Sequence, residues 1–286
     1  MNEQRRRDDM IIASEEHRYE IGKMVGTGGD GAYKLYVCRP EGSDRQCLLQ
    51  IAVELIHSGA LERTALFLKL LSDKADELEE LYASTKKNPE DMLNYGLGFP
   101  ELVESFICPE QGGRRVNILA FRNVEEVGRM VPISNIIRKD RQRVDLRTSA
   151  WIMGKALKLL AFFHNHGFAV EMVNATNILI EPDQHYVLFF DWSKAVNHEV
   201  GVNVETAGKE VSRTARAIVA LLGGDWKKGE IPVETEEQES GAEYVQFLLE
   251  LARGEHTSAD RAHERFYESV DELWAREFYP FTSYDR

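Results

Sequence analysis

The sequence lacks long apolar runs, and this absence bears on membrane location. No apolar run in the 286 residues approaches the roughly 20 residues that a membrane-spanning helix needs. Residues 1–9 are mostly polar and charged, and they lack the apolar core of a secretory signal peptide. We therefore expect a cytoplasmic protein that does not interact with a membrane.

Cysteine is also scarce. Cys38, Cys47 and Cys108 are odd in number and have no metal-ligand spacing, so we interpret them as reduced, apolar thiols. Cys38 and Cys47 could lie on adjacent strands, but a disulfide between them is disfavoured in a reducing compartment.

An excess of positive charge is absent. The formal net charge is −13, and no basic face is concentrated enough to offset it. Such a chain repels a phosphate backbone, so we expect no nucleic-acid partner. The chain also lacks a clear internal repeat, and its 43% apolar and 29% charged residues are typical of a globular protein with one large domain or two lobes.

The stretch of residues 151–196 organises the rest of the chain. Apolar residues recur at helical spacing from Trp151 to Phe163, and Gly167 then ends the run as a C-cap residue does. The pattern predicts one long helix.

A hairpin follows this helix. Two short apolar runs, 178–180 and 187–190, are joined by a turn sequence. Asn177 comes just before the first strand, and Asp191 comes just after the second. An amide and a carboxylate at the two ends of one hairpin can converge on a cation such as Mg²⁺, which prefers oxygen ligands.

These residues resemble the protein-kinase family, whose catalytic loop reads H-R-D-x-x-x-x-N and whose metal-binding turn reads D-F-G. In register, the family's His, Arg and Asp fall on Val170, Glu171 and Met172, and its Asn falls on Asn177. A D-W-S turn begins at Asp191. The thioether of Met172 has no useful basicity, so it cannot accept a proton as the family's loop aspartate does. The resemblance implies a retained scaffold without its catalytic base.

A glycine-rich segment lies near the N-terminus, between two alternating stretches at 19–25 and 32–38. Its glycines Gly26, Gly28 and Gly31 fit the family's phosphate loop, G-x-G-x-x-G, in which backbone N–H groups approach phosphate closely. Glycine-rich hairpins are common, so the motif is weak when taken alone.

The next strand resembles the family's V-A-I-K segment, with Gln50 in the position of the lysine. That lysine pairs with nucleotide phosphates and with a helix glutamate, and an uncharged Gln50 can do neither. A helix predicted over about 60–84 takes the place of the glutamate-bearing helix. Both Glu62 and Thr64 are candidates for the position of its glutamate.

Two larger residues stand where the family has the small residues that roof the adenine ring. These are Tyr33 in place of a valine and Leu48 in place of an alanine. Their extra volume competes with an adenine ring, and Asp30 adds a negative charge where phosphates would approach. The alternative is a reshaped lobe in which a nucleotide still fits.

The resemblance covers about residues 19–225 and implies an α+β, two-lobed protein-kinase-like fold. We expect a mobile tail over 1–18, an N-lobe over 19–123 with a five-stranded antiparallel sheet and a helix, and a reduced, mainly helical C-lobe over 124–286.

The segment after the D-W-S turn is short. Only residues 194–207 precede the next predicted helix, which runs from Gly208 to Leu222, and the family's A-P-E motif is missing. Glu210 takes the position of an aspartate that opens this helix in the family. So short a segment leaves little platform for a peptide substrate.

Our leading hypothesis is a pseudokinase, similar to uncharacterised bacterial kinase-like proteins. It would act as a regulatory or interaction module with an unknown protein partner, and it would require no cofactor. The rival hypothesis is an atypical phosphotransferase or nucleotidyl transferase. It would use ATP and Mg²⁺, with Asn177 and Asp191 as metal ligands and a displaced Glu171 as base. A third possibility is a binder of a non-nucleotide ligand.

Overall fold

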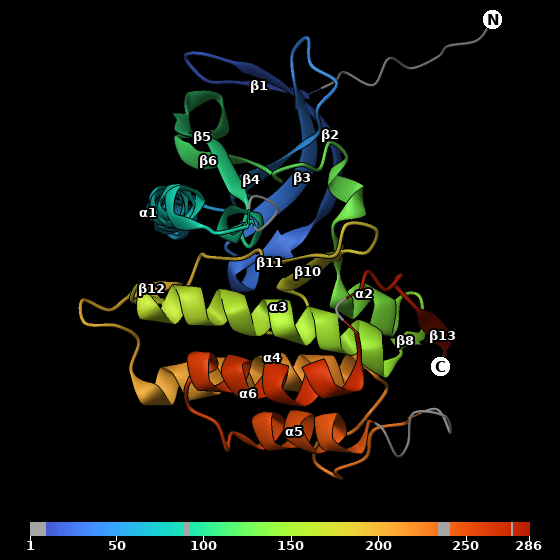
Figure 1. Cartoon of the computed structure of the whole chain (residues 1–286). Helices are drawn as coiled ribbons and strands as arrows, with labels where there is room; N and C mark the ends of the chain where they lie inside the picture. Colours follow the sequence, from blue (N-terminus) through green and yellow to red (C-terminus); the bar gives the residue numbers. More distant parts are fainter. Residues whose placement is uncertain (1–9, 89–91, 234–240, 276) are drawn as a thin grey trace, which may run out of the picture. The chain divides into compact units, whose positions relative to one another are not determined.

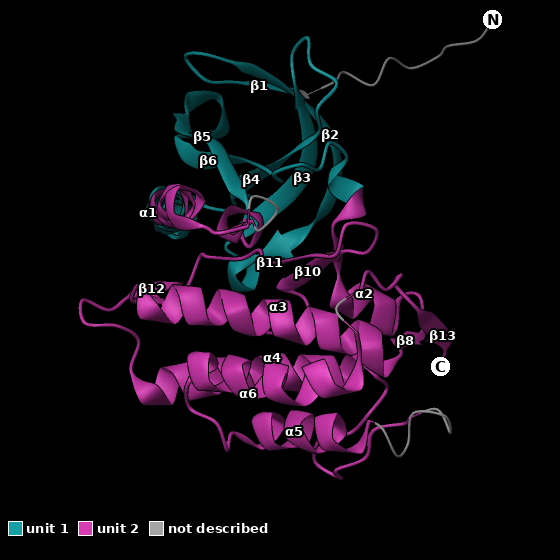
Figure 2. Ribbon diagram, viewed as in Figure 1, with its two compact units in different colours: residues 1–73, 100–128 teal, residues 74–99, 129–286 magenta. Residues whose placement is uncertain are grey.

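The computed structural model describes residues 10–88, 92–233, 241–275 and 277–286. The chain divides into two compact units, coloured separately in Figure 2. The first comprises residues 1–73 and 100–128, and the second comprises residues 74–99 and 129–286. The predicted boundary at 123/124 lies close to one of these divisions, whereas residues 74–99, predicted in the N-lobe, belong to the second unit.

The first unit is built on one antiparallel sheet with the strand order β1-β2-β3-β4-β6-β5 (Figure 1). Its strands are β1 (Met10–Ala13), β2 (Arg18–Gly28), β3 (Tyr33–Pro40), β4 (Cys47–Ala52), β5 (Glu101–Cys108) and β6 (Arg114–Ala120).

The sheet therefore has six strands, and the prediction of five was wrong. The sixth strand, β1, lies in the segment predicted as a mobile tail and pairs with β2 in a register that places Ile12 opposite Tyr19. The side chain of Ile12 is buried, which stabilises the strand despite its charged neighbours in sequence. The rest of the predicted tail that precedes β1, residues 1–9, lies outside the described residues.

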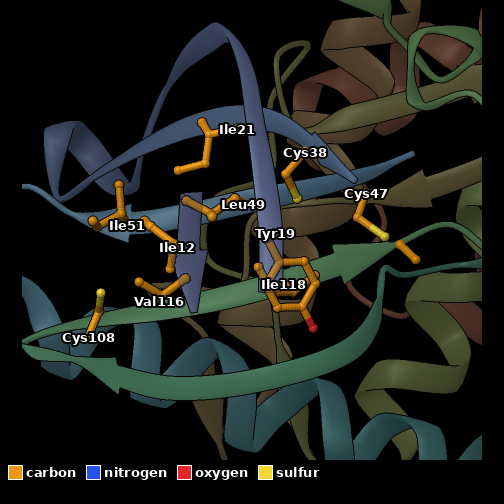
Figure 3. Packing of buried hydrophobic residues seen from close by; sticks show 11 residues of the cluster. Ile12, Tyr19, Ile21, Cys38, Cys47, Leu49, Ile51, Cys108, Val116 and Ile118 are labelled. Carbon is orange, nitrogen blue, oxygen red and sulfur yellow. The ribbon is translucent and has the colours of Figure 1, made fainter. Parts of the chain in front are cut away.

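One face of this sheet carries an apolar core. Figure 3 shows its side chains gathered between the strands. The three cysteines are free and buried, and Cys38 lies opposite Cys47 in the register of β3 and β4. Burial raises the pKa of both thiols. The core cluster comprises Ile12, Tyr19, Ile21, Cys38, Cys47, Leu49, Ile51, Cys108, Val116, Ile118 and Ala120.

The helix predicted over about 60–84 is α1 (Ser58–Thr85), which begins in the first unit and ends in the second. In the first unit, the α1 residue Leu61 packs with Tyr33 and Ala52. Tyr33 lies opposite Ala52 in the strand register, so α1 packs on the face of the sheet that points away from the cysteine-lined core.

The second unit contains α2 (Ile133–Arg138), α3 (Leu146–Asn165), α4 (Val204–Leu221), α5 (Ala242–Arg253) and α6 (Ala259–Leu273). The buried helix α3 packs against α4 and α6, and the three lie side by side in Figure 1. As predicted, α3 ends just before Gly167, whose φ of 80° favours glycine. Helix α4 begins four residues earlier than predicted, because the side chain of Asn203 accepts a hydrogen bond from the backbone N–H of Thr206 (2.9 Å) and caps the helix.

Short strands complete the second unit. The predicted hairpin is formed by β10 (Ile178–Glu181) and β11 (Tyr186–Phe189), joined by β7 (Val131–Pro132). Two further pairs are β9 (Phe168–Ala169) with β12 (Val196–Asn197) and β8 (Gln142–Val144) with β13 (Ser283–Asp285). Among the residues described, none of the helices combines the length and apolar character needed to cross a membrane.

Candidate functional site

The glycine-rich segment of the first unit is mostly strand. Strand β2 continues through Gly26 and Gly28, and only Gly29–Gly31 forms a turn, which is a short 3-10 helix. Asp30 in this turn is exposed and has a φ of 55°, which non-glycine residues adopt rarely. The turn is therefore shorter than the glycine-rich segment, which begins at Gly26.

Tyr33 fills the space beside this segment. Its side chain is only 1% exposed and packs with Ala52 and Leu61. It also lies directly against Gly28, because a Cβ atom at Gly28 would be 2.1 Å from the Tyr33 hydroxyl oxygen. Gly28 therefore leaves room for a tyrosine ring in this structure.

One face of the sheet carries the residues that we predicted at the adenine-roof positions and at the position of the family's lysine. Tyr33 lies opposite Ala52, and side chains at alternate positions of β4 point to the same side. Leu48, Gln50 and Ala52 therefore share a face with Tyr33, and all four are buried.

Gln50 is held by a residue that the sequence analysis missed. Asn117 lies opposite Gln50 in the register of β4 and β6, and both side chains are fully buried. The Asn117 amide donates to Gln50 Oε1 (3.3 Å) and to the backbone oxygen of Leu61 in α1 (2.9 Å). A polar residue within the apolar stretch V-N-I-L-A was the available signal.

The two candidates for the helix glutamate behave differently. The Glu62 carboxylate pairs with the guanidinium of Arg115 (3.2 Å), and its side chain is 68% exposed. Thr64 is buried, and its hydroxyl donates to the backbone oxygen of Ala60 (3.1 Å). Neither of these bonds involves Gln50.

In the second unit, Asn177 joins the ends of the hairpin. Its Nδ2 atom donates to the backbone oxygens of Met172 (2.9 Å) and Asp191 (3.2 Å). Its Oδ1 atom accepts from the backbone N–H groups of Phe190 (2.9 Å) and Asp191. The structure thus brings Asn177 into contact with the backbone of Met172 and of Asp191.

These bonds bear on the predicted metal site. Both lone pairs of Asn177 Oδ1 already accept backbone N–H groups, so metal ligation would displace one of them. The Asp191 carboxylate accepts from the N–H of Ser193 (3.0 Å). No cluster of three or more His, Cys, Asp or Glu side chains in the described part of the chain could hold a metal ion. A Mg²⁺ ion shared by Asn177 and Asp191 would therefore require one of the backbone bonds to Asn177 Oδ1 to open.

A buried carboxylate fixes the loop before Met172. Glu210 of α4 accepts from the backbone N–H of Glu171 and lies 2.8 Å from His164 Nε2. Arg213 donates to the backbone oxygen of Glu171 (2.9 Å). Glu171 has a φ of 62°, an unfavourable conformation that persists because these contacts hold its peptide groups on both sides.

Comparison with known proteins shows the fold. No protein-family model matches the chain, and no curated protein matches its sequence. Solved structures do match. Vaccinia related kinase 3 has a TM-score of 0.58 and 13% identity, covering 93% of this chain and 91% of that one. The BubR1 kinase domain has a TM-score of 0.55 and 10% identity, covering 93% and 87%. The chain has a protein-kinase-like fold.

A third structure of this fold is a double mutant of the Mycobacterium tuberculosis PknI kinase domain. It has a TM-score of 0.50 and 10% identity, covering 88% of this chain and 95% of that one. The predicted fold class is confirmed: an antiparallel N-terminal sheet with a long helix precedes a mainly helical C-terminal region. Identities this low show the fold alone, because one fold supports many functions.

Within this kinase-like fold, the segment after the D-W-S turn is bound to the end of α3. Strand β12 pairs with β9, the N–H of His198 donates to the oxygen of Gly167 (2.7 Å), and the N–H of Val202 donates to the oxygen of His164 (3.2 Å). Helix α4 then starts at Val204. The segment is therefore short and attached along its length.

Proposed function

We propose that this chain is a pseudokinase, which does not transfer phosphoryl groups and acts as a protein-interaction module. The observation that carries the proposal is the buried ring of Tyr33, packed against Gly28 on the sheet face that carries Gln50. A nucleotide that used this face in the family's manner would have to displace that ring. Displacing a close-packed aromatic side chain is costly, so we expect no nucleotide binding there.

The charges of the site support the same proposal. Phosphoryl transfer depends on positioning and on neutralising the developing charge. Gln50 brings no cation and is already bonded to Asn117. Met172 supplies no base, and the side-chain amide of Asn177 is hydrogen-bonded to backbone groups. The loss of several such groups together removes many powers of ten in rate.

The partner is proposed to be another protein. The segment that would carry a peptide substrate is short and bonded to α3. A regulatory role through binding requires no catalysis, so it is compatible with the groups that this site lacks.

Thermal unfolding with ATP and Mg²⁺ tests the proposal. A ligand at 100 times its Kd stabilises a protein by about 2.7 kcal/mol, which is several degrees in Tm for a protein of this size. We expect no shift for the natural chain. A reproducible shift of several degrees would refute the proposal.

A matched pair of variants sharpens this experiment. Tyr33→Val removes the ring that covers Gly28, whereas Tyr36→Val makes the same change beside the cysteine-lined core. If Tyr33 is what excludes the nucleotide, any binding gained should appear in Tyr33→Val and not in Tyr36→Val.

The rival hypothesis of an atypical transferase has its own test. Incubation with γ-labelled and α-labelled ATP would report phosphoryl and nucleotidyl transfer separately. We expect no labelled product from either. Label transfer that is lost in Asp191→Asn would establish the enzyme and overturn the pseudokinase proposal.

A further inference from the structure

Asn117 connects three elements of the first unit. It stands on β6, bonds to Gln50 on β4, and bonds to the backbone oxygen of Leu61 in the first turn of α1. Asn117 and Gln50 are both 0% exposed, so these bonds form without competition from water.

The contact carries no charge. A second link to α1 does carry charge: Arg115, which also lies on β6, pairs with Glu62. That ion pair is weak because the Glu62 side chain is 68% exposed and screened by solvent. The backbone N–H of Arg115 also donates to the hydroxyl of Ser58 (3.1 Å) at the start of the helix.

We propose that Asn117 is a positioning residue, whose neutral amide fixes the start of α1 on the sheet in one place. Because the bond is uncharged and internal to the unit, the position of the helix depends on neither a ligand nor the ionic strength. This inference rests on the proposed function and deepens it, since an interaction module of this kind would present one constant α1 surface to its partner.

Removal of Asn117 should loosen the start of α1, because both of its hydrogen bonds are lost. In the natural chain, Gln50 Nε2 and Asn117 Oδ1 already have no hydrogen-bond partner among the described residues. Without Asn117, Gln50 keeps a buried amide in which neither Oε1 nor Nε2 is paired. A buried polar group left unsatisfied costs free energy, so the effect should diminish when Gln50 is made apolar at the same time.

Hydrogen exchange of the full chain tests the proposal. We expect amides in residues 61–66 to exchange at least about 10-fold faster in Asn117→Leu, while those of β2 and β3 change little. The control is Glu62→Gln, which removes the ion pair and should change the same amides by less than about 3-fold. Equal effects, or a larger effect of Glu62→Gln, would overturn the assignment.

The double variant Gln50→Leu/Asn117→Leu distinguishes positioning by the amide from simple filling of space. It should recover part of the protection lost in Asn117→Leu, because no amide is then left unpaired. A further loss of protection contradicts the proposal.

If Asn117→Leu does not fold, the salt dependence of hydrogen exchange in Glu62→Gln still tests the proposal. In Glu62→Gln, the hydrogen-exchange protection of residues 61–66 should change by less than about 2-fold between about 0.05 M and about 1 M NaCl. Surface ion pairs become screened over this range of salt. A steep loss of protection with salt would contradict the uncharged contact.

Exchange of the natural chain with and without ATP and Mg²⁺ separates this inference from the proposed function. Protection of residues 61–66 that rises with nucleotide refutes the constant position of α1. Nucleotide binding seen in Tm, with α1 exchange unchanged, refutes only the pseudokinase proposal. No binding, with Asn117→Leu without effect on α1, refutes only the role of Asn117.

Discussion

Gly28→Ala should destabilise the first unit because Tyr33 occupies the space of the new methyl group. A Cβ atom at Gly28 would lie 2.1 Å from the Tyr33 hydroxyl oxygen, 2.2 Å from its Cζ and 2.7 Å from its Cε2. The φ of Gly28 is −144°, an extended value that any residue adopts, so the effect arises from packing alone. Tyr33 must shift, and overpacking of a buried site costs about 1–3 kcal/mol.

Gly26→Ala is the matched control. It makes the same change two residues earlier in β2, where a new Cβ atom meets nothing within 4 Å. We expect its free energy of unfolding to stay within about 0.5 kcal/mol of the natural chain. Urea denaturation of both variants measures the difference, with the slope m checked for constancy.

A second background isolates Tyr33 as the cause. In Tyr33→Ala the ring is absent, so the added cost of Gly28→Ala should fall to near zero, which gives a coupling energy of about 1–3 kcal/mol. Equal stabilities of the Gly26→Ala and Gly28→Ala variants, or a Gly28→Ala cost that persists without the ring, would refute the packing that we describe.

Three further predictions follow from other parts of the structure. Burial raises the pKa of the Cys38 and Cys47 thiols, so at about pH 8 a thiol reagent such as DTNB should label them only as the protein unfolds; fast labelling of the native protein contradicts this. Glu210→Leu removes a buried carboxylate that accepts a backbone N–H, so urea unfolding should show a loss of about 1–3 kcal/mol, whereas an unchanged midpoint argues against its role. Gly98→Ala would place a Cβ atom 2.0 Å from a methyl carbon of Leu159, so we expect a loss of about 1–3 kcal/mol that is relieved in a Leu159→Ala background.

Local sequence patterns predicted much of the fold. The apolar periodicity of α1 and α3 extends over many residues, and the two runs of the β10–β11 hairpin are adjacent in the chain. The bulky Tyr33 and the uncharged Gln50 were likewise visible as substitutions within a known motif. Such features can be predicted from residues that lie close together in the sequence.

The features that the sequence analysis missed depend on distant contacts. Strand β1 is four residues long, and it is stabilised by burial of Ile12 among strands that come later in the chain. Asn117 acquires its role only from pairing with Gln50 across 67 positions. The earlier start of α4 is different, because it depends on the local N-cap residue Asn203, a residue type that favours the start of a helix.

The attachment of residues 194–203 to α3 has a consequence for regulation. Backbone bonds join this segment to β9, Gly167 and His164, so little free chain length is left for a loop to change its path. A covalent modification or a partner that rearranges the segment must first open these bonds. The energetic barrier to such a change is therefore one of local unfolding, and it can be measured as slow exchange at the His198 and Val202 amides.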